Sequence, residues 1–199
     1  MKLSKTYIAN VDKYINYTGR GSLFTFEGMT IATNSISVII FTPDGDHERI
    51  EPSDFDGIKE GEYPNFGEHV WKYVIKPYWD DWAVAYKPTP TTLFLRDIKT
   101  DVDEVHMKHE IPVRTKLYDA TVTNGRFKTD IALKYGRDDG IWLNPELLYD
   151  VAKLITSKNK PVNIWIPNNK RNPAVVVGEN KYGRHLGFVM GVMKNFREN

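Results

Sequence analysis

The clearest hydrophobic pattern in the chain lies just after Gly140. Apolar residues there recur at offsets of one, four, seven and eight positions from Leu147, which makes one buried stripe on a helix. Asn144 is a good N-cap, and Pro145 suits the first helical position because its missing N–H costs nothing there. The pattern therefore predicts a helix that begins at Pro145 and ends before Pro161.

Three strands are expected after this helix. Val162, Ile164 and Ile166 alternate with other residues, as in a strand with one buried face. A short apolar strand over 174–177, a turn over 178–183 and a last strand over 186–193 complete the series. Gly187 and Gly191 interrupt the last strand and indicate bulges or a close approach of another backbone.

The N-terminal part of the chain predicts the same order of elements. Ile8, Val11 and Ile15 stand at helical spacing in 6–16, which Ser4 could cap. Three short strands are expected over 22–26, 29–32 and 37–41, with turns at 27–28 and 34–35. Helices followed by antiparallel meanders place the chain in the α+β class.

The middle of the chain is less clear. A polar loop is expected over 47–61, and the tryptophan-rich segment 70–82 could form a helix broken by Pro77 or a strand. Residues 88–92 suggest a stiff connector, Leu93 begins a strand, and 97–110 could form a helix or end in a strand. Asn124-Gly125 predicts a hairpin. We place the boundary between two modules, 1–104 and 105–199, in this region.

Composition excludes several classes. The chain has 199 residues, a net charge of +1 and no cysteine, so disulfides, cysteine-bound zinc and a global attraction to nucleic acid are not expected. No apolar run approaches the roughly 20 residues that cross a bilayer, and the first residues lack the apolar core of a signal peptide. A soluble cytoplasmic protein is the expectation.

The stretch 140–193 resembles the closing half-domain of DNA sliding clamps, the processivity rings of replicative polymerases. The matching features are an asparagine before the helix, hairpin-connected strands, and a final strand with a Met-Pro-Met-like motif, which here reads Met190-Gly191-Val192-Met193. The phrase over 62–66, Glu-Tyr-Pro-Asn-Phe, is similar to one at inter-domain junctions of bacterial clamps. The resemblance implies repeated βαβββ units, with antiparallel sheets backed by helices.

The resemblance also implies a function without catalysis or cofactor. The expected role is a polymerase processivity factor or clamp-related DNA-associated scaffold, of a phage or mobile-element type, and two-domain protomers would form a homotrimeric ring. Expected partners are double-stranded DNA, bound weakly and without sequence preference, and polymerase or other replication proteins, bound through short peptides. No membrane partner is expected.

Two sets of residues carry these expected contacts, and each also has an ordinary structural explanation. The DNA contacts would come from lysines that equally suit solvated helix faces: Lys5, Lys13, Lys153, Lys158 and Lys160. The peptide pocket would be built from apolar residues that equally suit core packing: Pro64, Val70, Met190, Val192 and Met193.

Two alternatives from other classes stay open. A metal-dependent hydrolase or nuclease could use the central acidic residues, of which 80–81 and the pair Asp101 and Asp103 are the clearest, although solvated turns explain them as well. His106 and His109 could bind a metal or lie in a charged, solvated segment. A structural or virion protein could instead use the tryptophan-rich segment 71–82 as an assembly surface.

Overall fold

The described part of the chain is an α+β fold with one large antiparallel sheet. The computed structural model describes residues 2–42, 48–61, 72, 76, 85–107, 133–135, 140–169 and 171–191. The helices within these ranges are α1 (Lys5–Ile15), α5 (Leu95–Met107) and α7 (Pro145–Ile155), with short 3-10 turns at Asn16–Thr18 and Pro52–Asp54. The strands are β1 (Ser22–Phe26), β2 (Met29–Thr33), β3 (Ser37–Phe41), β4 (Thr91–Leu93), β5 (Leu133–Tyr135), β6 (Ile141–Leu143), β7 (Val162–Trp165), β8 (Ala174–Asn180) and β9 (Gly183–Val189).

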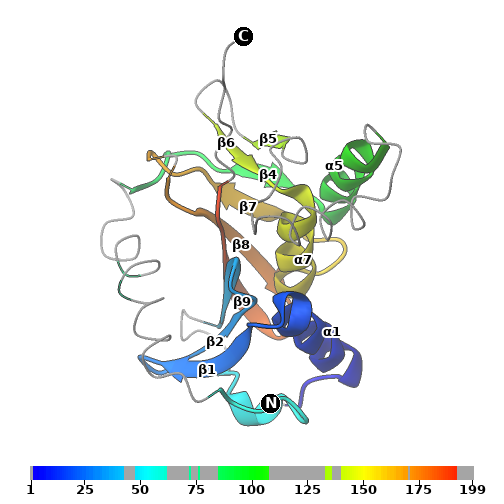
Figure 1. Ribbon diagram of the computed structural model, residues 1–199, viewed down its shortest axis with the longest axis vertical. Coiled ribbons are helices and arrows are strands. Elements are labelled where there is room, and N and C mark those ends of the chain that lie inside the picture. Colours follow the sequence, from blue (N-terminus) through cyan, green and yellow to red (C-terminus); the bar gives the residue numbers. More distant parts are fainter. Residues whose placement is uncertain are drawn as a thin grey trace.

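Strands from the N-terminal and C-terminal parts of the chain pair in the middle of the sheet. Seven strands pair in the order β1-β2-β3-β9-β8-β7-β4, and β5 and β6 form a separate hairpin pair. At the centre, β3 runs antiparallel to β9, with Ser37 opposite Val189 and Phe41 opposite His185. The meander β1-β2-β3 and the meander β7-β8-β9 are thus joined by their last strands (Figure 1).

Local chemistry explains the turns of the first meander. Glu27 and Gly28 both have positive φ, 47° and 73°, the combination that lets a two-residue hairpin follow the twist of its strands. In the next turn the side-chain oxygen of Asn34 accepts hydrogen bonds from the backbone amides of Ile36 and Ser37, at 3.0 and 2.8 Å. Both predicted turns are confirmed.

Both predicted N-cap residues, Ser4 and Asn144, begin the helices that the sequence assigns to them, α1 and α7. The Ser4 hydroxyl accepts a hydrogen bond from the Tyr7 amide at 3.3 Å, and Asn144 Oδ1 accepts from the Glu146 amide at 2.9 Å. These bonds satisfy amides that have no partner inside the helix. Figure 1 shows α1, α7 and α5 on the same side of the sheet.

Helix α7 approaches the sheet closely because two glycines lie beneath it. A Cβ atom on Gly187 would lie 2.2 Å from Val151 Cγ1, and one on Gly178 would lie 2.9 Å from Ile155 Cγ1. Gly187 pairs in register with Ile39 and Val176, so it marks no bulge, and the group that approaches it is the Val151 side chain instead of another backbone. Around this contact, the buried apolar residues of α1, α7 and the sheet form one core.

The opposite face of the sheet is buried as well. A second cluster there joins side chains of β1, β2, β3, β8 and β9 with Tyr86, which is 2% exposed. All five residues of β3 are buried, as are the first five of β8. This explains the uninterrupted apolar runs in these strands, which a sheet with one solvated face would not need.

Several predicted boundaries are wrong. The predicted turn over 178–183 is mostly strand, because Asn180 pairs with Gly183 and its Oδ1 accepts a hydrogen bond from the Tyr182 amide at 2.8 Å, which closes a two-residue turn. The last strand accordingly begins at Gly183 and ends at Val189, before Met190.

The connector expected over 88–92 ends in strand, since Thr91 and Thr92 belong to β4. Leu93 ends that strand instead of beginning one, and Leu95 starts α5. Asp97 explains this start, because its carboxylate accepts a hydrogen bond from the Phe94 amide at 2.8 Å, as in half of a capping box. Of the two readings of 97–110, the helix is correct as far as Met107. The segment 70–82, apart from residues 72 and 76, and the hairpin at 124–125 lie outside the described residues.

Candidate functional site

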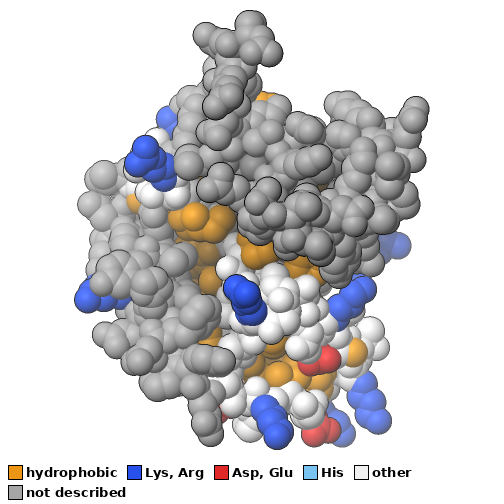
Figure 2. Space-filling model, viewed as in Figure 1, with side chains coloured by type: hydrophobic (Ala, Val, Ile, Leu, Met, Phe, Trp, Pro, Cys, Tyr) orange, Lys and Arg blue, Asp and Glu red, His pale blue; other side chains and the backbone are white. Residues whose placement is uncertain are grey.

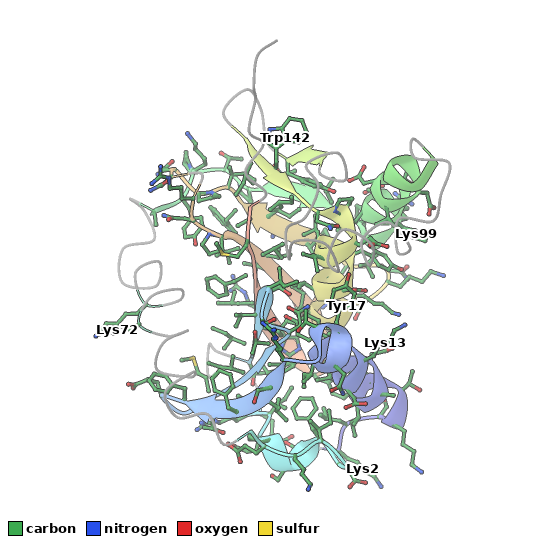
Figure 3. All side chains as sticks on the ribbon, in the orientation of Figure 1. Lys2, Lys13, Tyr17, Lys72, Lys99 and Trp142 are labelled. Carbon is green, nitrogen blue, oxygen red and sulfur yellow. The ribbon has the colours of Figure 1, made fainter. Side chains whose placement is uncertain are left out.

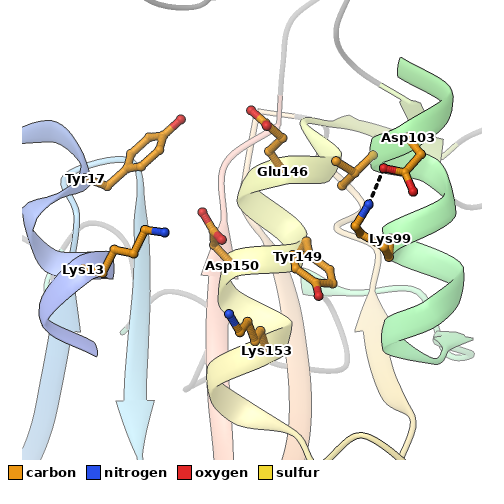
Figure 4. Close-up of a pocket in the computed structure, with 9 residues that line it drawn as sticks. Lys13, Tyr17, Lys99, Asp103, Glu146, Tyr149, Asp150 and Lys153 are labelled. Atoms are coloured by element: carbon orange, nitrogen blue, oxygen red, sulfur yellow. Dashed lines mark hydrogen bonds and ion pairs between the residues drawn. The ribbon is translucent and has the colours of Figure 1, made fainter. Parts of the chain in front are cut away.

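The three helices form a layer in which α7 lies between α1 and α5 (Figure 4). Helix α1 runs antiparallel to α7, because the Tyr7 hydroxyl, in its first turn, donates a hydrogen bond to the Leu154 carbonyl, in the last turn of α7, at 3.1 Å. The start of the final hairpin adds two bonds at the same place. Asn180 Nδ2 donates to the Leu154 carbonyl at 2.9 Å, and the Ser4 amide donates to the Tyr182 hydroxyl at 2.8 Å. These bonds set the spacing between α1 and α7.

The five lysines predicted to contact DNA all lie exposed on or just after these helices. Lys160 forms an ion pair with Glu179. Within the part of the chain that the structure describes, no ion pair involves Lys5, Lys13, Lys153 or Lys158. Figure 2 shows Lys and Arg side chains scattered over this face, with Asp and Glu side chains among them. The helix face therefore offers separate amines instead of one dense positive patch.

A groove of about 350 Å³ crosses the three helices. Figure 4 shows Lys13 of α1 directed toward α7, and Asp150 and Lys153 of α7 on the side facing α1. The charged residues that line the groove balance in sign: Lys13, Lys99, Lys153, Asp103, Glu146 and Asp150. Such a lining favours weak, salt-sensitive contacts over tight binding of a polyanion.

A second pocket, of about 510 Å³, opens between the first turn of α5 and the end of α7. It shares Lys99 and Tyr149 with the groove, so the two hollows adjoin. The described residues of its lining include cations and aromatic rings and no carboxylate: Phe94, Leu95, Arg96, Lys99, Tyr149, Lys158 and Asn159. This pocket was not predicted from the sequence, because its basic residues come from two helices that lie far apart along the chain.

Of the predicted peptide pocket, only Met190 belongs to the described residues. Met190 follows β9 and is 40% exposed. Among the described residues, it is the one large apolar side chain classed as exposed. Pro64, Val70, Val192 and Met193 lie outside the described residues, so the pocket stays a prediction.

The acidic residues proposed for metal chemistry have other partners where they are described. Asp101 accepts a hydrogen bond from the Tyr135 hydroxyl at 2.7 Å, and Asp103 pairs with Lys99 on the same helix. Burial, and then this bond to Asp101, raise the pKa of Tyr135. No group of three or more His, Cys, Asp or Glu that could hold a metal occurs among the described residues. The side chain of His106, His109 and the pair 80–81 fall outside them.

His185 is a buried polar residue that sequence reasoning missed. Its Nδ1 accepts a hydrogen bond from the Thr42 amide at 3.2 Å, and its Nε2 lies 2.9 Å from Asn180 Oδ1. An acceptor at Nδ1 and a carbonyl oxygen at Nε2 require the neutral tautomer with the proton on Nε2. The residue is fully buried on β9, so its role is structural.

Comparison of the chain with protein families, with curated proteins and with solved structures found no match. Among the described helices, none has the length and apolar character that spanning a membrane requires.

Proposed function

We propose that the protein is a non-catalytic, sliding-clamp-like factor that associates with duplex DNA and tethers a polymerase or another replication protein. The observation that carries this proposal is the paired arrangement around the centre of the sheet. Helix α1 precedes the meander β1-β2-β3, and α7 precedes β7-β8-β9. The two helices are antiparallel on one face, and the two meanders join through antiparallel β3 and β9.

This arrangement supports two copies of one unit related by an approximate two-fold axis. In the second copy β6 precedes α7, which gives the order βαβββ, whereas the described residues before α1 contain no strand. A pair of helices presented side by side by a continuous sheet is the geometry that the resemblance to clamps implies. Two such helices would contact the phosphates of a duplex without an element that enters a groove to read bases.

The charge of the helix face fits a sliding contact. Lys13 and Lys153 flank the boundary between α1 and α7, and Asp150 lies between them (Figure 4). Phosphate contacts of this kind position the duplex and carry no sequence information. Because few amines take part, the affinity should be low, and its salt slope should be only about one for each phosphate contacted.

The number of copies in a ring follows from what one chain contributes. One seven-stranded sheet includes both meanders, so a chain could supply a single clamp-like domain. A trimer, as predicted from the sequence, assumes two domains per chain. Light scattering distinguishes the trimer from a ring with more copies and from a monomer.

DNA binding is tested by anisotropy of a labelled duplex at low and high salt. The variants Lys13→Glu and Lys153→Glu, combined, should weaken binding at low salt by about tenfold or more, since two phosphate contacts become repulsive. Lys72→Glu is the control for each single lysine variant, because Lys72 is exposed and lies on the side of the molecule away from α1 and α7 (Figure 3).

Topology provides the second readout. A clamp is retained on circular DNA and leaves linear DNA at its ends, so retention should be lost when the circle is cut. An oligomer that binds both forms equally, or a monomer indifferent to duplex DNA, would contradict the proposal. The hydrolase and the virion alternatives stay predictions, since no described residue favours either.

A further inference from the structure

We propose that the pocket between α5 and α7 binds a nucleotide unit of single-stranded DNA, with its phosphate among Arg96, Lys99 and Lys158 and its base against the Tyr149 ring. This inference rests on the proposed function only in taking DNA as the source of the nucleotide. It differs from that function in the form of DNA that is bound.

The charge of the pocket suits a phosphate group. Three cationic side chains line it, and none of the described residues that line it is acidic. This separates it from the adjoining groove, where lysines and carboxylates balance. A phosphate is the anion of nucleic acids that such a set of donors suits, because guanidinium and ammonium groups both bond its oxygens.

The three cationic side chains can bind a ligand with little loss of protein stability. Lys158 is exposed and forms no ion pair within the described part of the chain. Arg96 lies 3.6 Å from Asp97, with 82% of its side chain exposed, and Lys99 pairs with Asp103 while half exposed. Exposed pairs of this kind contribute little to stability, so a phosphate can replace the carboxylate as partner.

The size of the pocket and its aromatic side chains suit a nucleotide base. About 510 Å³ lies within the range of pockets that hold small organic ligands, so the pocket is larger than a phosphate alone needs. Tyr149 is half-buried on α7 and lines both hollows. The guanidinium of Arg96 lies over the Phe94 ring, 5.2 Å from its centroid, and both side chains line the pocket.

An unpaired base fits this pocket, whereas a base pair does not expose the face that stacking needs. Proteins that bind single strands combine a positive groove with aromatic rings on which bases stack. Duplex DNA instead meets a protein through its outer phosphates, for which a concave aromatic pocket has no use. The geometry therefore favours a single strand that leaves the duplex beside α1 and α7.

The test is the anisotropy of a fluorescein-labelled thymidine dodecamer, with a labelled duplex measured in parallel. Arg96→Glu should lower dodecamer affinity by about tenfold and reduce the salt slope by about 0.7, the value for one phosphate contact on a single strand. Its duplex affinity should stay within about twofold of the wild type. Lys72→Glu is the charge-matched control and should change neither.

Tyr149 tests the base. Tyr149→Phe keeps the ring and should bind normally, and Tyr149→Ala should weaken the dodecamer about tenfold. Because Tyr149 also packs against the core, its alanine variant is interpreted only beside its melting curve; Arg96 is exposed and avoids this ambiguity.

Unlabelled thymidine monophosphate and thymidine identify the ligand. Competition by the monophosphate and not by the nucleoside supports the phosphate site, and competition as strong as that of the unlabelled dodecamer would make a free nucleotide the source. Equal loss in Arg96→Glu and Lys72→Glu, or equal competition by both monomers, overturns the inference. If the protein binds the dodecamer but does not bind duplex DNA, the proposed function is wrong and the inference about the pocket stands.

Discussion

His185 joins the two central strands of the sheet through its side chain. It receives the Thr42 amide on one ring nitrogen, faces Asn180 Oδ1 with the other, and meets the Phe41 ring edge-on at 5.7 Å. Replacing it with alanine leaves the buried Thr42 amide without this partner and opens a cavity, while Asn180 Oδ1 keeps the hydrogen bond from the Tyr182 amide.

We therefore expect His185→Ala to lower the free energy of unfolding by about 2–4 kcal/mol, measured by urea denaturation. Arg184→Ala, at the exposed neighbouring position, is the control and should cost little. A loss of less than about 1 kcal/mol in His185→Ala would mean that water satisfies the Thr42 amide.

Tyr14 links stability to alkaline pH. Burial raises the pKa of its phenol well above the ordinary 10.0; its hydrogen bond with Ser37 lowers this pKa, and the charge of Asp150 raises it. Because the folded pKa exceeds the unfolded one, the stabilisation is complete below pH 10.0 and is lost as the pH rises above it. Above pH 10.0, titration of Tyr14 lowers the free energy of unfolding by about 1.4 kcal/mol for each further pH unit.

Tyr14→Phe removes the titrating group. Its unfolding free energy should be slightly below that of the wild type at pH 8, because the bond to Ser37 is lost. It should then decline less steeply between pH 10 and 11, measured by urea denaturation at each pH. Parallel declines would show that Tyr14 is not a source of the alkaline sensitivity.

Among the elements, the contact between α7 and β9 depends most on a single position. Gly187→Ala would bring its Cβ to 2.2 Å from Val151 Cγ1, and the β-branched Val151 has little freedom to move aside. We expect a cost of about 1–3 kcal/mol by chemical denaturation, from overpacking. Because the buried Val151→Ala also costs stability, the double variant should lose less than the sum of the two single losses, and full additivity would contradict direct contact.

Elements with their own caps and periodicity could be predicted from the sequence. Helices α1 and α7 and the strands of the first meander depend on nearby residues, such as Ser4 and Asn144, and their predicted bounds are close to those observed. The turn between β8 and β9 was predicted too long because its closure depends on the side chain of Asn180. The start of α5 likewise depends on Asp97, which the charged sequence does not single out.

The candidate site could be predicted only in part. The exposed lysines follow from their positions on helices, which the sequence places correctly. The grooves between helices do not, because Lys99, Tyr149 and Lys158 meet only when α5 packs on α7. Pairing of β3 with β9 is a contact of the same kind, so the sequence pattern predicted two similar units and not the single sheet they share.

For the whole molecule, one continuous core predicts one unfolding event. Side chains of α1, α7 and the central strands belong to the same buried cluster, so neither meander can lose its partner without exposing it. Urea curves followed by far-ultraviolet circular dichroism and by tyrosine and tryptophan fluorescence should therefore coincide. Separate midpoints would indicate two independently stable units.

The seam between β3 and β9 also sets an order of events during synthesis. Thr42 and His185, which bond across it, are separated by 143 positions. At roughly 5–20 residues per second, β3 emerges about 7–30 s before its partner exists. A nascent chain would carry an apolar strand edge for that time, and such edges invite pairing with other chains. The ribosome-bound N-terminal half is therefore where we expect a need for chaperones and a sensitivity to translation speed.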